Sequence, residues 1–424
     1  MQKLSKEAKA SWCLFVVCWL VYAIVSMTKS AFSASIASIV SEGILNKADA
    51  GVINACFYLF YGGAQLVFLK AVDKISPIKL ITMTLLGTLA SLIGMALSTS
   101  FLPMLIWWSF CGLMQFAIWP AVLRLMSEYL LPEHEGFAHI AIAFSYCAGS
   151  LLNYLLAALL LAVGRWQLLF WSFAGIVGAF LLVWFIVAGK TVPVLTAFRK
   201  PQVLETAAVL QEKPADNGGL FKILLSSGLV FLLITGFSRT ALDAGLKSWV
   251  PTMIVENYKD TVSISFANVL TTVLICVNLT GAFIATFIYP KRIKSAVWAL
   301  SACFLSVVPF MVLLLWTGKI AVALVVLSLT VITTMMYAGH QLINVIIPSR
   351  FSKLGKEGSV CAILNAFASF GAVAANFCFG FLSEHYGWTA TTASWIVIAM
   401  LAFLFTALAA PKWKRFFRER GEAL

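Results

Sequence analysis

The sequence predicts an all-α integral membrane protein with twelve transmembrane helices, arranged as two pseudo-symmetric six-helix bundles. Three observations predict this class: few charged residues, many long apolar runs, and a repeat that relates the two halves. Of the 424 residues, 61% are hydrophobic and only 11% are charged, whereas a soluble domain carries about 25% charged residues. The chain cannot cover itself with a water-facing surface, so its expected solvent is lipid.

Twelve apolar runs are each long enough to cross a hydrocarbon core about 30 Å thick. They are too long for the strands of a barrel, so each is expected to be a helix that satisfies its own backbone in lipid. The first run follows a basic start without a cleavage site, and we expect it to be retained as a helix. In chain order the expected spans are Trp12–Val40, Ala48–Leu69, Pro77–Ser98, Pro103–Tyr129, Phe137–Val163, Leu168–Ala188, Leu220–Met253, Ser263–Tyr289, Ser295–Trp316, Ile320–Ile347, Gly358–His385 and Trp388–Ala410.

A repeat around the fifth and eleventh runs predicts that the two halves are related. Gly149 lies 13 residues after Gly136 and 17 before Trp166. The same spacings recur 222 residues later at Gly358, Gly371 and Trp388. The polar stretch 189–219 divides the runs six and six, and its prolines and mixed charge predict a flexible linker. The expected units are therefore an N-terminal bundle (1–188), a cytoplasmic linker (189–219), and a C-terminal bundle with a cytoplasmic tail (220–424).

The net charge of +13 is concentrated on one side of the expected membrane, which argues against nucleic-acid binding. The N-terminal segment, the even-numbered loops and the C-terminal tail hold 23 of the 30 Lys and Arg residues, whereas the opposite loops hold four. Positive charge gathers on the cytoplasmic side of membrane proteins. The pattern predicts a multi-pass protein of the plasma (inner) membrane with both termini in the cytoplasm.

The remaining three cations lie within the apolar runs. Lys29 is in the first run, and Arg239, Asp243 and Lys247 lie at i, i+4 and i+8 on one face of the seventh. These runs are the first helices of the two halves, so each half can direct a cation at a central cavity. Charges inside a membrane are costly and mark substrate pathways, although snorkelling and structural pairing are alternatives. Because one carboxylate faces three cations, we expect an anionic substrate to neutralise the excess.

Other polar residues in the runs could line the same cavity. Tyr22 precedes Lys29 by two helical turns and shares its face. Tyr146 and Gln341 could donate hydrogen bonds, and His340 could carry a coupling proton or serve as a packing residue. The cysteines lack metal-ligand spacing, and we expect neither a metal nor a cofactor.

Several motifs resemble those of the major facilitator superfamily, and in particular its organophosphate:phosphate antiporters. Asp73, Lys74 and Pro77 resemble the loop signature that follows helix two. The fourth run matches the pattern G-x-x-Q-x-x-x-W-P-x-x-x-R-x-M of the glycerol-3-phosphate antiporters at Gly112, Gln115, Trp119, Pro120, Arg124 and Met126. The resemblance implies two parallel six-helix halves with the substrate between them.

The first helices of the two halves also resemble those of that family. Tyr22, Lys29 and Phe32 have the spacing of its tyrosine, arginine and phenylalanine, and Arg239 precedes a W-x-P-T element at Trp249. The resemblance implies that Lys29 and Arg239 clamp a phosphate group. Lysine replaces the family's arginine, which substitutes a point charge for a planar fork, so a carboxylate could be bound instead.

These observations predict a secondary transporter of a small organic anion working by alternating access. A phosphorylated metabolite is favoured, such as a sugar phosphate or glycerol phosphate exchanged for phosphate. The alternatives are a proton- or sodium-coupled carboxylate symporter and an anion-binding receptor. An enzyme is not expected, because the runs lack paired acids, a nucleophile with a base, or clustered metal ligands, and drug efflux is disfavoured by the cationic excess. The expected partners are the anion and the lipid bilayer, with the chain as a monomer.

Overall fold

The protein is described by a computed structural model over residues 6–68, 75–162, 164–206, 217–258, 262–285, 293, 295–317, 322–351 and 357–419. Helices dominate these ranges, and none of them contains a β-strand. The first half contains α1 (Lys6–Lys29), α2 (Ala31–Ser41), α3 (Lys47–Val67), α5 (Pro77–Leu97), α6 (Phe101–Gln115), α7 (Ile118–Tyr129), α8 (Pro132–Ala141), α9 (Ala143–Leu161) and α10 (Gln167–Thr206). The second half contains α11 (Asn217–Ser226), α12 (Leu229–Asn257), α13 (Ile264–Phe283), α15 (Ala296–Thr317), α16 (Val322–Gln341), the π-helical segment η2 (Leu342–Ile346), α17 (Ile347–Ser349), α18 (Glu357–His385) and α19 (Gly387–Arg418).

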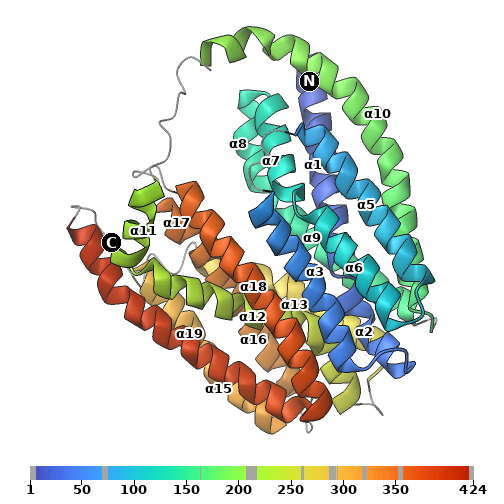
Figure 1. The fold of residues 1–424 in the computed structure, drawn as a ribbon, viewed down its shortest axis with the longest axis vertical. Coiled ribbons are helices and arrows are strands. Elements are labelled where there is room, and N and C mark those ends of the chain that lie inside the picture. Colours follow the sequence, from blue (N-terminus) through green and yellow to red (C-terminus); the bar gives the residue numbers. More distant parts are fainter. Residues whose placement is uncertain are drawn as a thin grey trace.

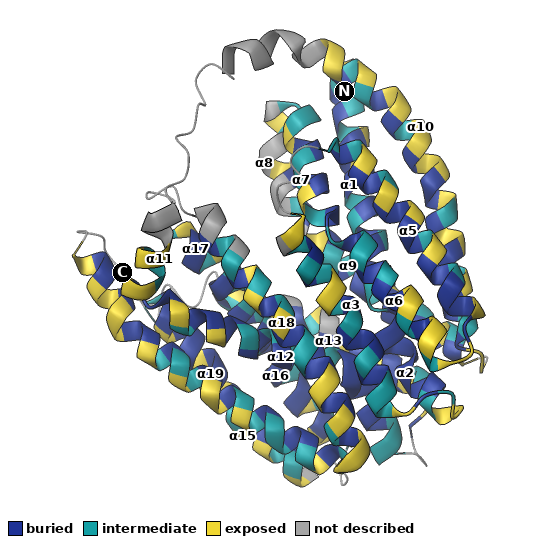
Figure 2. Cartoon of the chain, in the orientation of Figure 1, coloured by how far each residue is buried: buried dark blue, intermediate teal, exposed yellow. Residues whose placement is uncertain are grey.

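The prediction of an all-helical membrane protein is confirmed. Within the described ranges, ten helical segments are long and apolar enough to cross a membrane. The helices α3 and α13 occupy the two remaining predicted runs, so a helix stands at each of the twelve positions. Large apolar side chains are exposed on the outer helices, as at Leu182, Phe185 and Ile186 of α10, and Figure 2 shows such exposed stretches along α10 and α19. This surface suits lipid rather than water.

The connection between the halves is more helical than the sequence predicts. Helix α10 continues through residues 189–206, and α11 already begins at Asn217, so much of the expected flexible linker is helix. Pro193 and Pro201 do not end α10, because a proline inside a helix can bend it and leave the turns on either side intact. Figure 1 shows α10 curving over one end of the first half. Residues 207–216 of the expected linker lie outside the described residues.

Among the described residues, most contacts between the two halves are made by three pairs of helices. Helix α3 packs along α18, α9 along α13, and α2 against α12. The ribbons of the two halves diverge toward the face that carries both termini and come together toward the opposite face (Figure 1). We call these the terminal face and the Lys47 face, because Lys47 pairs with Glu256 of α12 near the latter, at 2.9 Å between Nζ and Oε2.

Two glycines fix equivalent close contacts in the two halves. A Cβ atom at Gly149 of α9 would overlap the carbonyl oxygen of Ala23 in α1. A Cβ atom at Gly371 of α18 would overlap the carbonyl oxygen of Phe237 in α12 in the same way. The sequence repeat that pairs Gly149 with Gly371 therefore corresponds to the same helix-on-helix approach in both halves, which only a small residue permits.

Candidate substrate site

Lys29 lies where the first membrane run breaks into two helices. It is the last residue of α1, Ser30 forms a turn with φ −100° and ψ 3°, and α2 starts at Ala31. Its Nζ atom lies 3.7 Å from the ring centroid of Tyr61 and 5.7 Å from that of Tyr58, both on α3. No ion pair to Lys29 occurs among the described residues. Aromatic faces thus hold this ammonium group, which leaves it available to an anion.

The three charged residues of α12 share one face, as the sequence predicts, but their pairing is unequal. Asp243 Oδ2 lies 2.9 Å from Lys247 Nζ and 3.9 Å from Arg239 Nη1. Arg239 is buried, with 4% of its side chain exposed. Its Nη2 donates to Thr240 Oγ1 at 2.6 Å, and its Nε has no hydrogen-bond partner among the described residues. The carboxylate is therefore held mainly by Lys247, and Arg239 keeps unused hydrogen-bonding capacity.

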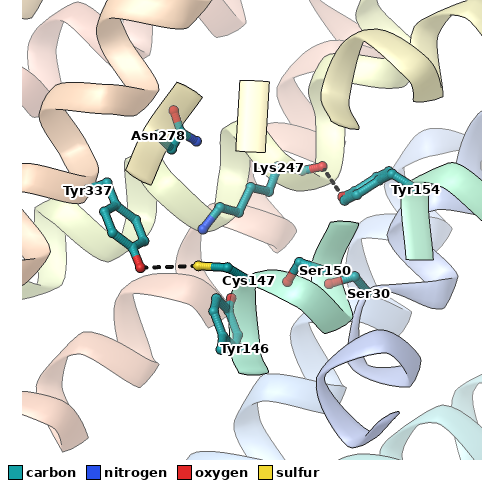
Figure 3. A pocket seen from close by; sticks show the side chains of 8 residues that line it. All are labelled: Ser30, Tyr146, Cys147, Ser150, Tyr154, Lys247, Asn278 and Tyr337. Carbon is teal, nitrogen blue, oxygen red and sulfur yellow. Dashed lines mark hydrogen bonds between the residues drawn. The ribbon is translucent and has the colours of Figure 1, made fainter. Parts of the chain in front are cut away.

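A pocket next to Lys247 draws its lining from both halves (Figure 3). The first half contributes side chains of α9 and the turn before α2, and the second half contributes side chains of α12, α13 and α16. The lining residues are Ser30, Tyr146, Cys147, Ser150, Tyr154, Lys247, Asn278 and Tyr337.

Two hydrogen bonds cross between the halves at this pocket. Tyr154 donates its hydroxyl to the backbone oxygen of Lys247 at 2.9 Å, and the Tyr337 hydroxyl lies 3.3 Å from Cys147 Sγ. In Figure 3 the ammonium group of Lys247 points into the space between these residues.

The other predicted site residues have different surroundings. Tyr146 lines the pocket and has Lys247 Nζ 5.9 Å from its ring centroid. Tyr22 packs its ring on Trp119 at 4.7 Å between centroids. His340 contacts Asn344 at 2.8 Å through Nδ1 and lies within electrostatic range of the α12 charges.

Gln341 is less closely connected to the site. It is the half-buried last residue of α16, and its side chain makes no hydrogen bond to another described residue.

Tyr58 connects Lys29 to the charges of α12. It lies 5.7 Å from Lys29 Nζ, and it is also within electrostatic range of Asp243, Lys247 and Tyr146. The structure thus places Lys29 and the α12 charges around one group of tyrosines. Tyr58 and Tyr61 are not among the site residues predicted from the sequence, although their i, i+3 spacing on the second run puts both on one helical face.

The loop motif is only partly described by the structure. Asp73 and Lys74 lie outside the described residues, and Pro77 is the first residue of α5. Arg124 Nη1 donates to the Ile75 oxygen at 3.0 Å and so ties α7 to the start of α5.

Gln115, from the motif of the fourth run, contacts the residue that precedes Lys29. It is fully buried, and its Nε2 lies 3.1 Å from Thr28 Oγ1, next to Lys29 in the chain.

Comparisons with known proteins define the family. A model of the Major Facilitator Superfamily matches residues 18–355, so the chain belongs to this superfamily. A probable hexose phosphate transport protein of Chlamydia muridarum is 22% identical over 405 residues, covering 91% of this chain and 87% of the relative. The membrane sensor protein UhpC of Salmonella typhimurium is 26% identical over 152 residues, 36% of this chain and 34% of the relative.

Solved structures share the fold. A bacterial homolog of the human lysosomal transporter Spinster, in an inward-facing and unoccupied conformation, has a TM-score of 0.77 at 15% identity and covers 97% of this chain and 99% of its own. The nucleoside transporter NupG has a TM-score of 0.73 at 12% identity, with coverages of 96% and 99%. The protein is therefore a multi-pass membrane transporter of a small molecule and is not an enzyme, as the sequence predicts.

Proposed function

We propose that the protein is a secondary active transporter of a small organic anion, with a phosphorylated metabolite as the favoured substrate. The observation that carries this proposal is the unequal pairing of the membrane charges. Asp243 is engaged by Lys247 at 2.9 Å, whereas Arg239 is 3.9 Å from the carboxylate and Lys29 contacts tyrosine rings. An anion that contacts Lys29 and Arg239 would supply the charge that the described part of the protein does not.

Two findings favour a phosphate group over a carboxylate. A phosphate monoester carries nearly two negative charges at neutral pH and several strong acceptor oxygens, which suits two cations at one site. The relatives from two Chlamydia species are named probable hexose phosphate transport proteins and match this chain over nearly its whole length. Sugar phosphate or glycerol phosphate exchanged for phosphate is therefore the preferred reaction.

The charge distribution gives the proposed orientation. With the termini in the cytoplasm, the Lys47 face is the outer face and the terminal face is the inner one. The halves then diverge toward the cytoplasm, which is an inward-facing arrangement. The bundles 1–188 and 220–424 would rock against each other around the central site.

Competition between Asp243 and the anion would couple anion binding to the movement of the two halves. Without substrate, the carboxylate is the counter-ion that lowers the cost of placing Arg239 and Lys247 inside the membrane. An incoming anion competes with Asp243 for Arg239, and Lys247 retains the carboxylate because it is the closer partner. Binding of the anion thus neutralises Arg239 and favours the state in which both halves close around the anion.

A proton-coupled carboxylate symporter is the second candidate. Its proton carrier would be His340, which lies within electrostatic range of Arg239, Asp243 and Lys247. Protonation of His340 would add a further positive charge to the cluster, and carboxylate uptake would then follow an imposed proton gradient.

Proteoliposome uptake tests the proposal. Vesicles that contain the purified chain and internal phosphate should accumulate labelled hexose phosphate or glycerol phosphate. The Lys29→Ala plus Arg239→Ala double variant should lose this uptake, and Lys79→Ala plus Arg165→Ala, which removes two exposed cations, should retain it. Full uptake by the first pair would overturn the assignment of the site. Counterflow separates transport from binding alone, because a receptor would bind the anion without accumulating it.

A further inference from the structure

The pocket of Figure 3 contains polar groups that the proposed anion clamp does not use. Ser150 is 6% exposed and Asn278 is 5% exposed. The Ser150 hydroxyl makes no hydrogen bond within the described part of the chain, and neither do the side-chain hydroxyls of Ser30 and Tyr146. Ser150 is buried, and Ser30 and Tyr146 are half-buried at the pocket, so these hydroxyls have hydrogen-bonding capacity that a ligand in the pocket can use.

The side-chain oxygen of Asn278 is hydrogen-bonded within the protein, and its NH₂ group is available to a ligand. Thr333 Oγ1 lies 2.7 Å from Asn278 Oδ1, and Thr334 Oγ1 lies 3.4 Å from the same atom. These hydroxyls fix the end of the amide that faces α16. The other end, the NH₂ group, is turned toward the pocket in Figure 3.

Lys247 adds hydrogen-bond donors to the pocket, but Asp243 neutralises most of its charge. Its ammonium group has three hydrogens, and its charge is already matched by Asp243 at 2.9 Å. The pocket lining contains no carboxylate. Its chemistry is therefore that of hydroxyl and amide groups around a neutralised ammonium, which is suited to a neutral, hydrogen-bonding part of a ligand.

A ligand with several hydroxyls satisfies this set of groups. Each hydroxyl both donates and accepts, so it can pair with a serine or tyrosine hydroxyl, an amide or an ammonium. An apolar ligand would leave these buried groups unpaired, which is strongly unfavourable. A site built to bind hydroxyls rejects an analogue that lacks them by a large factor.

The pocket is next to residues of the proposed anion site. Ser30 directly follows Lys29 in the chain, and Lys247 shares Asp243 with Arg239. A ligand whose anionic group binds Lys29 and Arg239 would therefore have its remaining part next to the pocket.

We infer that this pocket binds the hydroxylated part of the transported anion, and that the substrate is a polyhydroxylated organic anion such as a sugar phosphate. The inference rests on the proposed function. It adds Asn278, Ser150 and Ser30 as residues that determine specificity, and Thr333 as a residue that positions Asn278.

The experiment compares ligands that share an anionic group and differ in hydroxyls. The full chain in proteoliposomes is tested for competition by hexose 6-phosphate and inorganic phosphate, and by a six-carbon sugar acid and hexanoate. Asn278→Leu should raise the half-saturating concentration of the hydroxylated member of a pair about tenfold, and leave that of the other member within about twofold. Thr333→Val should act in the same direction with a smaller effect.

Asn268→Leu is the matched control. Asn268 is a buried asparagine of the same helix, and its Nδ2 donates to Ile264 within that helix at 3.1 Å, away from the pocket. This variant should leave the ratio within each ligand pair unchanged. An equal effect of Asn278→Leu on both members of a pair, or no effect on either, would overturn the inference.

The two proposals can fail separately. If the wild-type chain accepts the sugar acid but neither phosphate ligand, the phosphate preference fails, and the sugar acid and hexanoate still test the pocket. If wild-type binding of every accepted anion is independent of hydroxyls, the pocket assignment fails, and an anion transporter remains.

Discussion

Two buried polar regions join the halves of this transporter, and they differ in how completely their hydrogen bonds are satisfied. The first is the pocket around Lys247 with the neighbouring Arg239. The second lies toward the Lys47 face and consists of Ser33, Asn54, Ser248 and Asn376, which we call the interface cluster. Ser248 follows Lys247 directly in α12, so the two regions are adjacent. The interface cluster is buried, whereas Lys247 is half-buried.

The interface cluster is a closed hydrogen-bond network. Asn54 Nδ2 lies 3.1 Å from both Ser33 Oγ and Ser248 Oγ and 2.7 Å from Asn376 Oδ1. Asn54 Oδ1 accepts from Trp108 at 3.3 Å, and Asn376 Nδ2 donates to its own helix. The backbones also touch here, because a Cβ at Gly51 would lie 2.6 Å from the Asn376 carbonyl oxygen.

The completeness of the hydrogen bonding distinguishes a ligand-binding site from a structural contact between the halves. In the interface cluster the protein supplies its own partners, so the network stabilises the contact between the halves. Among the described residues, Arg239 Nε and the hydroxyls of Ser150 and Tyr146 have no protein partner, so a ligand is expected there. Substitutions in the two regions should therefore have opposite consequences for stability and for anion binding.

The largest effect is expected for Arg239→Met. Loss of the buried guanidinium should weaken anion binding about 100-fold, because truncating one partner of a desolvated charge pair costs about 2–5 kcal/mol. Thermal stability without ligand should be unchanged or higher, since an incompletely paired buried charge is removed. Thermal melting with and without hexose phosphate checks both points, and Arg239→Lys serves as the charge-retaining control. Ligand-induced stabilisation equal to wild type would assign Arg239 to the structure instead.

A smaller effect of the opposite kind is expected for Asn54→Leu. The change leaves Asn376 Oδ1 without its 2.7 Å donor and should lower the stability of the protein by about 1–3 kcal/mol. The stabilisation gained on adding anion should persist. The Asn54→Leu plus Asn376→Leu double variant should lose less stability than the sum of the losses in the two single variants, because both hydrogen-bonding partners are then removed. Additive losses in this double-mutant cycle would show that the two amides do not act together.

The smallest effect is expected at the aromatic support of Lys29. Tyr61→Leu removes the ring that lies 3.7 Å from the ammonium group, and should weaken anion binding about 3- to 10-fold, in keeping with a cation–π contribution of about 0.5–2 kcal/mol. Tyr61→Phe keeps the ring and should stay within about twofold of wild type. Competition binding measures both variants. If the phenylalanine variant were as weak as the leucine variant, the hydroxyl rather than the ring would be the important group.

By itself the sequence determined the fold class, the number of apolar spans and the identity of the membrane charges. These follow from local properties: hydropathy reports the length of each span, and the rarity of charges in lipid makes Lys29, Arg239, Asp243 and Lys247 conspicuous. The repeat of Gly149 and Gly371 was also readable, because a close helix contact needs a small residue wherever it occurs.

Tertiary structure alone decided which groups meet. Asp243 is equally spaced from Arg239 and Lys247 along the chain, and only side-chain packing makes Lys247 the closer partner. The packed halves add a relation that spacing did not reveal. Ala23 contacts Gly149, and Phe237 contacts Gly371, so Ala23 and Phe237 are equivalent positions of the two halves. Lys29 and Asp243 each lie six residues further along the chain and are therefore also equivalent. The pocket likewise depends on residues more than 180 positions apart, such as Cys147 and Tyr337, because convergence of distant helices is a property of packing and not of local sequence.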